Sequence, residues 1–374
     1  MRVFHIEPDG FRELAALPEA LPERGFLWLG YGRRVFEVGE PVLQHALARW
    51  GCGNIVDLHV SDLINNQLPS HFDYTSWYDM LVFRRLAAAP GSQDLFVDDE
   101  HGTLASAQRA LRAIDTSPVG FAVFDRVLVT VHPTDCQVRE FFAHKLDRLT
   151  EGRDKRDARG GARLPASPAD LMLRMVNHMV DSYLELRRLL TRQLGTLQRV
   201  LLDQNSEFND WPLLLESRDA LHRLEDTCED QRSAVQEWID ALDEWPADGD
   251  PHVARERELL RVRSRDVLEH IERVSHHVHR MELSAEAAVQ MHFSAQSNRA
   301  NDIMRTLTTL TAIFLPLNLI AAVFGMNFDV LPLVHKEDGF WWAMGAMAGI
   351  GLALLVFFLR RRYIERDTLM GENT

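Results

Sequence analysis

The sequence predicts an α+β head, a helical bundle, a long stalk helix and two membrane-spanning helices. Two uncharged runs carry most of this prediction: Thr306–Phe328 has 23 residues and Gly339–Leu359 has 21. A helix of roughly 20 residues crosses a hydrocarbon core of about 30 Å, so each run is long enough to span a bilayer. A third observation is that the mixed pattern of the first 145 residues gives way to helical periodicity from Asp170 onward.

Composition removes several classes of function. The chain has 374 residues and a net charge of −14, whereas a nucleic-acid binder needs a basic surface that displaces counterions. Its three cysteines form no CxxC pair, which argues against a disulfide framework or zinc ribbon and fits a reducing compartment. The N-terminus lacks the pattern of a signal peptide. No GxxxxGK(S/T), GxSxG, HExxH or GxGxxG motif occurs, so we expect neither an enzyme nor an ATP-driven pump.

The head should be a mixed α/β domain. Short runs of β-branched, aromatic and aliphatic residues between turn signals predict its strands. The expected strands are Gly25–Gly30, Asn54–Val60, Trp77–Phe83, Gly120–Phe124 and Val127–His132. Only Asp125 and Arg126 separate the last two, which predicts a tight hairpin.

The following segments should be helical. Ser167 before Pro168 is typical of a helix start, with a capping side chain and a proline in the first turn. Apolar residues recur at three- and four-residue steps through Leu171–Leu202 and Trp211–Leu242. Val253–Phe324 then predicts one helix of roughly 100 Å at 1.5 Å per residue.

Basic residues orient the two predicted spans. Arg360, Arg361 and Arg362 follow the second span directly, so both termini should face the cytoplasm across an inner membrane. The predicted segments are the α/β domain with its linker (1–168), the bundle (169–250), the stalk (251–304), the first span (305–328), the external loop (329–338), the second span (339–359) and a basic tail (360–374).

One face of the first span mixes polar and apolar side chains. Its members recur every three or four residues: Asn301, Met304, Thr308, Thr311, Leu315, Asn318 and Ala322. Polar groups in a membrane helix usually face a bundle interior or a water path. The pattern alone leaves two interpretations open, which are a pore lining and a helix–helix contact.

The end of this span resembles a known family. Gly325-Met326-Asn327, flanked by Phe324 and Phe328, is similar to the signature of the CorA magnesium transporters. The resemblance is strong over residues 255–362 and looser over the head, where Asp57–Leu63 matches best. It implies a funnel-shaped homo-oligomeric channel of five copies that conducts Mg²⁺, with Co²⁺, Ni²⁺ and Zn²⁺ as further candidates. It also implies transport driven by the inside-negative potential.

The resemblance assigns roles to particular residues. Gly325, Met326 and Asn327 would form the selectivity ring, because amide oxygens bind the waters of a hydrated Mg²⁺ without stripping them. The implied pore-lining residues are Asn301, Met304, Leu307, Thr308, Thr311, Leu315 and Asn318. Met304 with Leu307 or Leu315 would form an apolar constriction. The family usually has threonine where this chain has Asn318, which leaves the mid-pore site open.

Regulation is implied by a second matching stretch. Arg265–His270 resembles the family segment whose aspartate binds a regulatory metal between subunits, so Asp266 is the expected ligand. Its partner would be an acidic residue of the adjacent head, with Asp94, Asp98, Asp99 and Glu100 as candidates. Metal bound there would favour a closed state.

Two alternatives stay open. Four histidines on the stalk, His270, His276, His277 and His279, keep a proton-coupled Zn²⁺ transporter on the same scaffold in view. Met326 favours the magnesium branch, because zinc-transporting relatives often vary that position. A membrane-anchored metal sensor is the second alternative, and a flux measurement would separate it.

Overall fold

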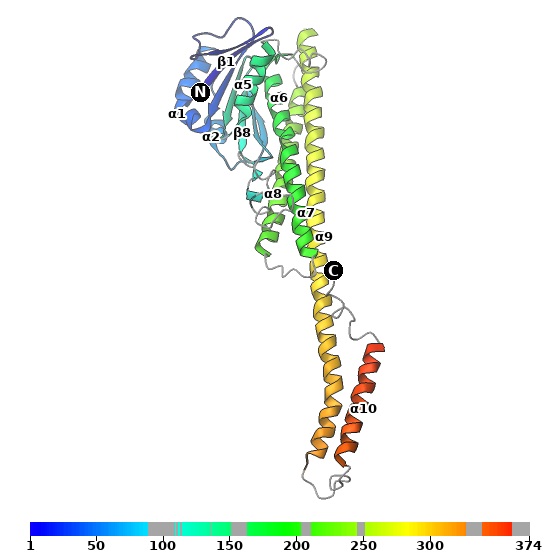
Figure 1. The fold of residues 1–374 in the computed structure, drawn as a ribbon. Helices are drawn as coiled ribbons and strands as arrows, with labels where there is room; N and C mark the ends of the chain where they lie inside the picture. Colours follow the sequence, from blue (N-terminus) through cyan, green and yellow to red (C-terminus); the bar gives the residue numbers. More distant parts are fainter. Residues whose placement is uncertain are drawn as a thin grey trace. The chain divides into compact units, whose positions relative to one another are not determined.

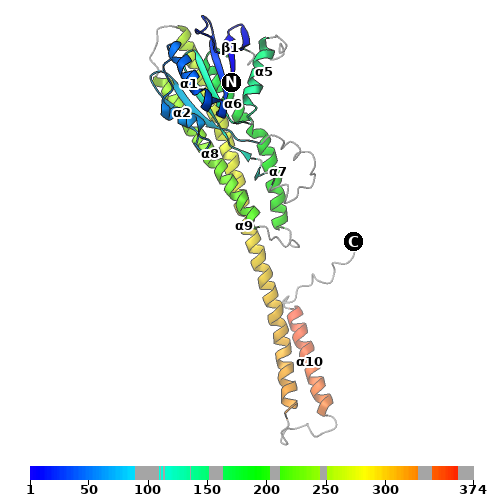
Figure 2. The same ribbon diagram turned by 90° about the vertical axis from the view of Figure 1, so that its left-hand side faces the viewer.

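The computed structural model describes residues 1–88, 109, 111–112, 114–134, 136–150, 163–202, 211–244, 251–326 and 339–360. The chain divides into two compact units, Met1–Ala287 and Ala288–Thr374. Figures 1 and 2 show the first unit as a sheet with helices beside it, and the second as a pair of helices.

A mixed seven-stranded sheet forms the centre of the head. Its order is β2-β1-β3-β9-β8-β5-β4, and of its pairs only β3 with β9 is parallel. The strands are β1 (Arg2–Glu7), β2 (Gly10–Leu14), β3 (Phe26–Gly32), β4 (His71–Tyr74), β5 (Asp79–Arg84), β8 (Pro118–Val123) and β9 (Val127–His132), while β6 (Ala87–Ala88) and β7 (Ile114–Asp115) form a separate pair.

Helices cover both faces of this sheet. Helices α1 (Arg33–Arg49) and α2 (Asp57–Ile64) pack on one face, and α5 (Val138–Thr150) and α6 (Pro168–Asp181) lie on the other (Figure 1). Strands β8 and β9 are therefore buried along their whole length, which explains their nearly continuous apolar sequences.

The structure confirms the predicted hairpin and corrects one strand. Strands β8 and β9 pair antiparallel, closed by a 2.9 Å bond from the Phe124 amide to the Val127 carbonyl. The strand expected over Asn54–Val60 is wrong, because α2 begins at Asp57. The β-branched residues suggested a strand. His59 and Leu63, however, lie four residues apart on one face of α2, and both are buried in the head.

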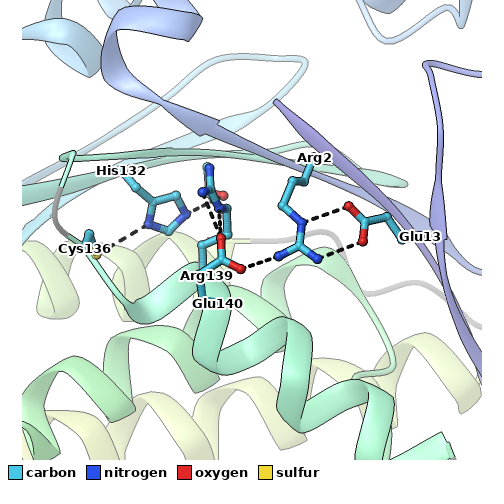
Figure 3. Close-up of polar contacts among 7 residues, drawn as sticks. Arg2, Glu13, His132, Cys136, Arg139 and Glu140 are labelled. Carbon is cyan, nitrogen blue, oxygen red and sulfur yellow. Dashed lines mark hydrogen bonds and ion pairs between the residues drawn. The ribbon is translucent and has the colours of Figure 1, made fainter.

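A polar network ties α5 to the sheet edge (Figure 3). Arg2 of β1 binds both carboxylate oxygens of Glu13 on β2 and also pairs with Glu140 of α5. Arg139 donates to the same Glu140 at 2.8 and 3.0 Å. Arg139 belongs to α5 itself, so it is the Arg2–Glu140 pair that links α5 to β1.

Four helices complete the head. The Ser167 hydroxyl accepts from the Asp170 amide at 3.3 Å, which confirms the predicted start of α6. The helix predicted over Leu171–Leu202 is divided at Ser182 into α6 and α7 (Tyr183–Leu202). Helices α8 (Trp211–Glu244) and α9 (Pro251–Phe324) follow.

The second unit contains the end of α9 and α10 (Gly339–Arg360). The most apolar window in each helix has a mean hydropathy of 2.0 and 2.1, with 6% and 0% of it buried. A core helix of a soluble protein would be buried, whereas these two present their apolar side chains outward. Length, composition and exposure therefore identify two candidate membrane spans.

Candidate ion pathway and metal sites

All seven predicted pore-lining residues, from Asn301 to Asn318, lie on the exposed surface of α9. Met304, Leu307 and Leu315 are 61%, 56% and 67% exposed, although each is apolar. The more covered positions are Thr309, Ala312, Ile313, Pro316, Leu317, Ile320 and Phe324. At 3.6 residues per turn, this covered stripe lies roughly opposite the predicted pore face.

Helix α10 accounts for the covered stripe. A Cβ added at Gly351 of α10 would lie 3.7 Å from Cδ1 of Leu317, so the two helices touch there. Both ribbon views place α10 beside this part of α9 (Figures 1 and 2). The polar face is thus left uncovered by its own chain and available to neighbouring copies or to water.

Threonine hydroxyls on the predicted pore face are oriented so that they can accept hydrogen bonds from outside the helix. Thr308 donates to the Met304 carbonyl at 2.7 Å and Thr311 to the Leu307 carbonyl at 2.9 Å. With its hydrogen committed to the backbone, each hydroxyl oxygen offers lone pairs outward. Waters around a divalent cation point their hydrogens outward, so an acceptor surface suits a hydrated ion.

The helix ends where the motif begins. Helix α9 stops at Phe324, and the Gly325 amide still donates to the Ala321 carbonyl at 2.9 Å. Met326 follows with 46% of its surface exposed. Asn327, the predicted ligand of the ring, lies outside the described residues, so its role remains a prediction.

The predicted regulatory residue lies beside a cavity in the head. Asp266 on α9 borders a cavity of about 260 Å³ that the structure places between α5, α6 and α9. Its carboxylate is 3.9 Å from His270, whose other ring nitrogen is 3.5 Å from Asp181 of α6. The lining residues are Lys145, Leu173, Arg174, Asn177, His178, Asp181, Arg263, Asp266 and Val267.

The acidic residues at this cavity differ in whether they pair with arginine. Buried Asp170 pairs with both Arg174 and Arg263, and burial lowers the pKa of Arg174 to about 10. Asp181 and Asp266 form no ion pair with lysine or arginine in the part of the chain described. The exposed acidic pair with His270 is thus the part of the cavity suited to a cation.

Sequence reasoning missed part of this arrangement. It singled out Asp266, whereas the structure adds Asp181 and an Asn177 carboxamide oxygen that is buried without a hydrogen-bond partner. Asn177 and Asp181 are four residues apart on α6, a spacing that places them on one face. The candidate partners Asp94, Asp98, Asp99 and Glu100 lie outside the described residues.

The four stalk histidines do not converge on one site. His277 contacts the Tyr183 hydroxyl at 2.8 Å, and His279 lies 3.0 Å from Glu225 of α8. His270 instead faces Asp181 on α6, and His276 is exposed. The other three histidines point toward three different helices because α9 packs against α6, α7 and α8 on different faces.

The buried His132 and Cys136 do not form an activated nucleophile (Figure 3). The sulfur lies 3.8 Å from Nδ1 of His132. Full burial, with nearby Arg139 and Arg85, lowers the pKa of His132 to about 3, and burial raises the pKa of the Cys136 thiol. A reactive cysteine needs the opposite shift of the thiol, so this pair is part of the packing.

The chain matches the family model of the CorA-like Mg²⁺ transporter proteins over residues 99–362. It is 34% identical to YfjQ of Bacillus subtilis over 114 residues, or 30% of this chain and 35% of that protein. It is 22% identical to the cobalt/magnesium transport protein CorA of Thermotoga maritima over 194 residues, 52% of each chain. These matches span about a third to a half of the curated relatives.

The fold has a solved counterpart. The CorA magnesium transporter of Methanocaldococcus jannaschii matches with a TM-score of 0.68 and 15% identity over 97% of this chain and 98% of that one. This likeness confirms the predicted fold class of a mixed α/β domain, a long helix and two C-terminal helices. With the family model covering most of the sequence, the chain belongs to the CorA-like Mg²⁺ transporter family.

Proposed function

We propose that this chain is one subunit of a homo-oligomeric channel that admits hydrated Mg²⁺ across an inner membrane, with Co²⁺ as a second cation. The observation that carries the proposal is the polar face of α9, which is exposed and opposite the stripe that meets α10. A single helix cannot enclose a pore, so copies must bring these faces together, five of them as the family resemblance implies.

Ion selection is assigned to hydration rather than to direct ligation. Mg²⁺ releases its water slowly, so a conducting site must hold the hydrated ion weakly enough to let it leave. Carboxamides of Asn301, Asn318 and Asn327 and the hydroxyls of Thr308 and Thr311 supply neutral acceptors. Met304, Leu307 and Leu315 add apolar rings that close the path when they dewet.

Regulation is assigned to the Asp266 cavity. Cytosolic Mg²⁺ bound by Asp266, together with Asp181 and a carboxylate of the neighbouring head, would bridge subunits and favour a closed pore. Empty, the carboxylates repel one another, which opposes that closed arrangement. Transport would thus be limited by the ion that it delivers.

The test is Mg²⁺ uptake into liposomes that contain the purified chain. Asn327→Ala should abolish uptake, and Thr311→Val should lower it, while Thr311→Ser should retain it. Thr306→Val is the matched control, because Thr306 makes the same backbone bond, to Asp302 at 2.9 Å, from the other side of the helix. Equal loss in Thr306→Val and Thr311→Val would argue against this pore face.

Two further results would redirect the assignment. Zn²⁺ uptake that requires a pH gradient would indicate a proton-coupled zinc transporter. Absence of flux for Mg²⁺, Co²⁺ and Zn²⁺ in protein that is folded and inserted would favour a membrane-anchored sensor.

A further inference from the structure

A second group of potential metal ligands lies between α8 and α9, away from the pore face and the Asp266 cavity. Ligand atoms of His222, Glu225 and Glu282 all lie within 4.8 Å of one another. His279 lies 3.0 Å from the Glu225 carboxylate. We call these four residues the His–Glu cluster.

The cluster has a repeated pattern. Each helix carries a histidine followed three residues later by a glutamate: His222 with Glu225 on α8, and His279 with Glu282 on α9. The helices run antiparallel, so each glutamate meets the histidine of the other helix. His222 lies 4.0 Å from Glu282 and His279 lies 3.0 Å from Glu225. Metal sites in helical bundles use a glutamate and a histidine three residues apart, in the order Glu-x-x-His. Here each helix carries the same two ligand types at the same spacing in the reverse order.

The two carboxylates also touch each other. Glu225 and Glu282 share a hydrogen bond, with side chains 26% and 17% exposed. Among the described residues, the other charged groups that act on the pair are His222, His279 and a third glutamate, Glu286. Two half-buried carboxylates in contact repel unless a proton or a cation lies between them. A bound cation would take the place of the shared proton and relieve the repulsion between the two carboxylates.

We propose that the His–Glu cluster binds one Zn²⁺ ion per chain, through His222, Glu225 and Glu282. Imidazole with carboxylates suits Zn²⁺, whereas Mg²⁺ prefers an all-oxygen shell rich in water. Zinc ligands lie at about 2.0–2.2 Å, so the three side chains must close in slightly around the ion. His222 is 67% exposed and glutamate has three rotatable bonds, so this closure needs no change of backbone. His279 holds the Glu225 carboxylate in position.

The ion would tie α8 to α9 within the head. Residues on both sides of the cluster already join these helices, since Trp238 donates to Ser264 at 2.9 Å and Arg218 faces Glu286 at 3.9 Å. A metal bridge between them stabilises the folded head, because the unfolded chain does not hold the four residues together.

The test measures Zn²⁺ binding rather than transport. Full-length protein in detergent, stripped of metal, is equilibrated with Zn²⁺ in excess Mg²⁺, and bound zinc is counted per chain. The double variant Glu225→Gln and Glu282→Gln should bind one Zn²⁺ fewer than the unchanged chain. His279→Ala should weaken binding roughly 10- to 100-fold. His276→Ala is the matched control, an exposed histidine of the same helix outside the cluster.

A second variant and a second measurement test the site independently of the double variant. His222→Ala changes an exposed side chain, so it tests the site even where the double variant fails to fold, and it too should lose the ion. Co²⁺ substituted for Zn²⁺ should give visible absorption in the unchanged chain and none in His222→Ala. Unchanged zinc counts in both variants would overturn the proposal and leave an ordinary ion-pair network. If the chain binds Zn²⁺ at this site but transports no Mg²⁺, the proposed channel function is overturned and the zinc site is not.

Discussion

At the scale of single residues, Gly25 shows how tightly the head constrains its chain. Its φ of +74° lies in the left-handed region, and a Cβ there would meet the Ile6 carbonyl oxygen at 2.0 Å. Gly51 has a similar φ of +77°, but no atom lies within 4 Å of a Cβ at that position. Comparing substitutions at the two positions therefore distinguishes the cost of backbone strain from the cost of a steric clash.

Gly25→Ala should lower the free energy of unfolding of the head by about 3 kcal/mol or more, through strain plus the clash with β1. Gly51→Ala should lose only about 1 kcal/mol, from strain alone. Thermal unfolding of the two variants beside the unchanged chain measures both. Equal losses would show that the Ile6 contact relaxes without consequence.

His132 gives the head a sensitivity to acid. Its pKa is about 3 in the folded head and 6.5 in the unfolded chain, so below pH 6.5 only the unfolded chain takes up the proton. The contribution of His132 to the free energy of unfolding is fully present above pH 6.5. It falls as the pH drops toward 3, by about 2 kcal/mol at pH 5. His132→Gln should flatten the thermal stability profile between pH 7.5 and 5. A profile as steep as that of the unchanged chain would assign the acid sensitivity to other groups.

At the scale of elements, Asp170 connects α6 to α9. The carboxylate is 9% exposed and accepts from Arg174 on its own helix and Arg263 on α9. The Arg263 pair crosses between the helices, so the aspartate fixes how α9 lies against the cavity. Removing the negative charge would leave Arg174, which is 19% exposed, and half-buried Arg263 without their shared counter-charge.

Asp170→Asn should destabilise the head by about 3 kcal/mol. The matched control is Asp181→Asn on the same helix, where the side chain is 47% exposed and the expected change is within about 0.5 kcal/mol. Thermal unfolding distinguishes them, and equal stability of the two variants would contradict the buried bridge. Asp181→Asn should nevertheless weaken inhibition of flux by internal Mg²⁺.

Elements differed in how far the sequence predicted them. The spans, the stalk helix and the β8–β9 hairpin were predictable because long apolar runs and a short turn are local signals. Strand β1 and helix α5 were not, since Arg2 and Glu140 interact over 138 positions of sequence. The strand predicted at Asn54–Val60 was wrong because the tertiary contacts of His59 override β propensity.

The candidate sites show the same limit. The pore face and the regulatory role of Asp266 were predicted from residue spacing and from resemblance, and both stay predictions. Asp181 and the His–Glu cluster were not, because their members are brought together by helix packing across separate stretches of sequence. Each stretch alone is an ordinary charged helical surface.

At the scale of the whole molecule, the proposed channel needs no chemical fuel. Each unit charge moved through the membrane potential is worth about 2.3 kcal/mol per 100 mV, so a divalent ion gains about 4.6 kcal/mol. This free energy suffices for uptake against a concentration gradient.

Uptake of Mg²⁺ should therefore follow the potential set by a potassium gradient and valinomycin. Collapse of the potential at constant pH gradient should stop net uptake against a gradient. Fluorescence of a magnesium dye inside the liposomes measures the rate at each potential. Uptake that ignores the potential and follows the pH gradient would contradict the channel.

The placement of the cysteines has a practical consequence for chemical labelling. Cys136 and Cys228 are buried with raised thiol pKa values, and Cys52 is half-buried. The sequence has three cysteines, and all lie before residue 229, so α9 and α10 contain no thiol. A cysteine introduced singly along α9 should thus react with a water-soluble maleimide against a low background. Scanning residues 301–326 in this way would map, residue by residue, which side of the helix meets water in the assembled channel.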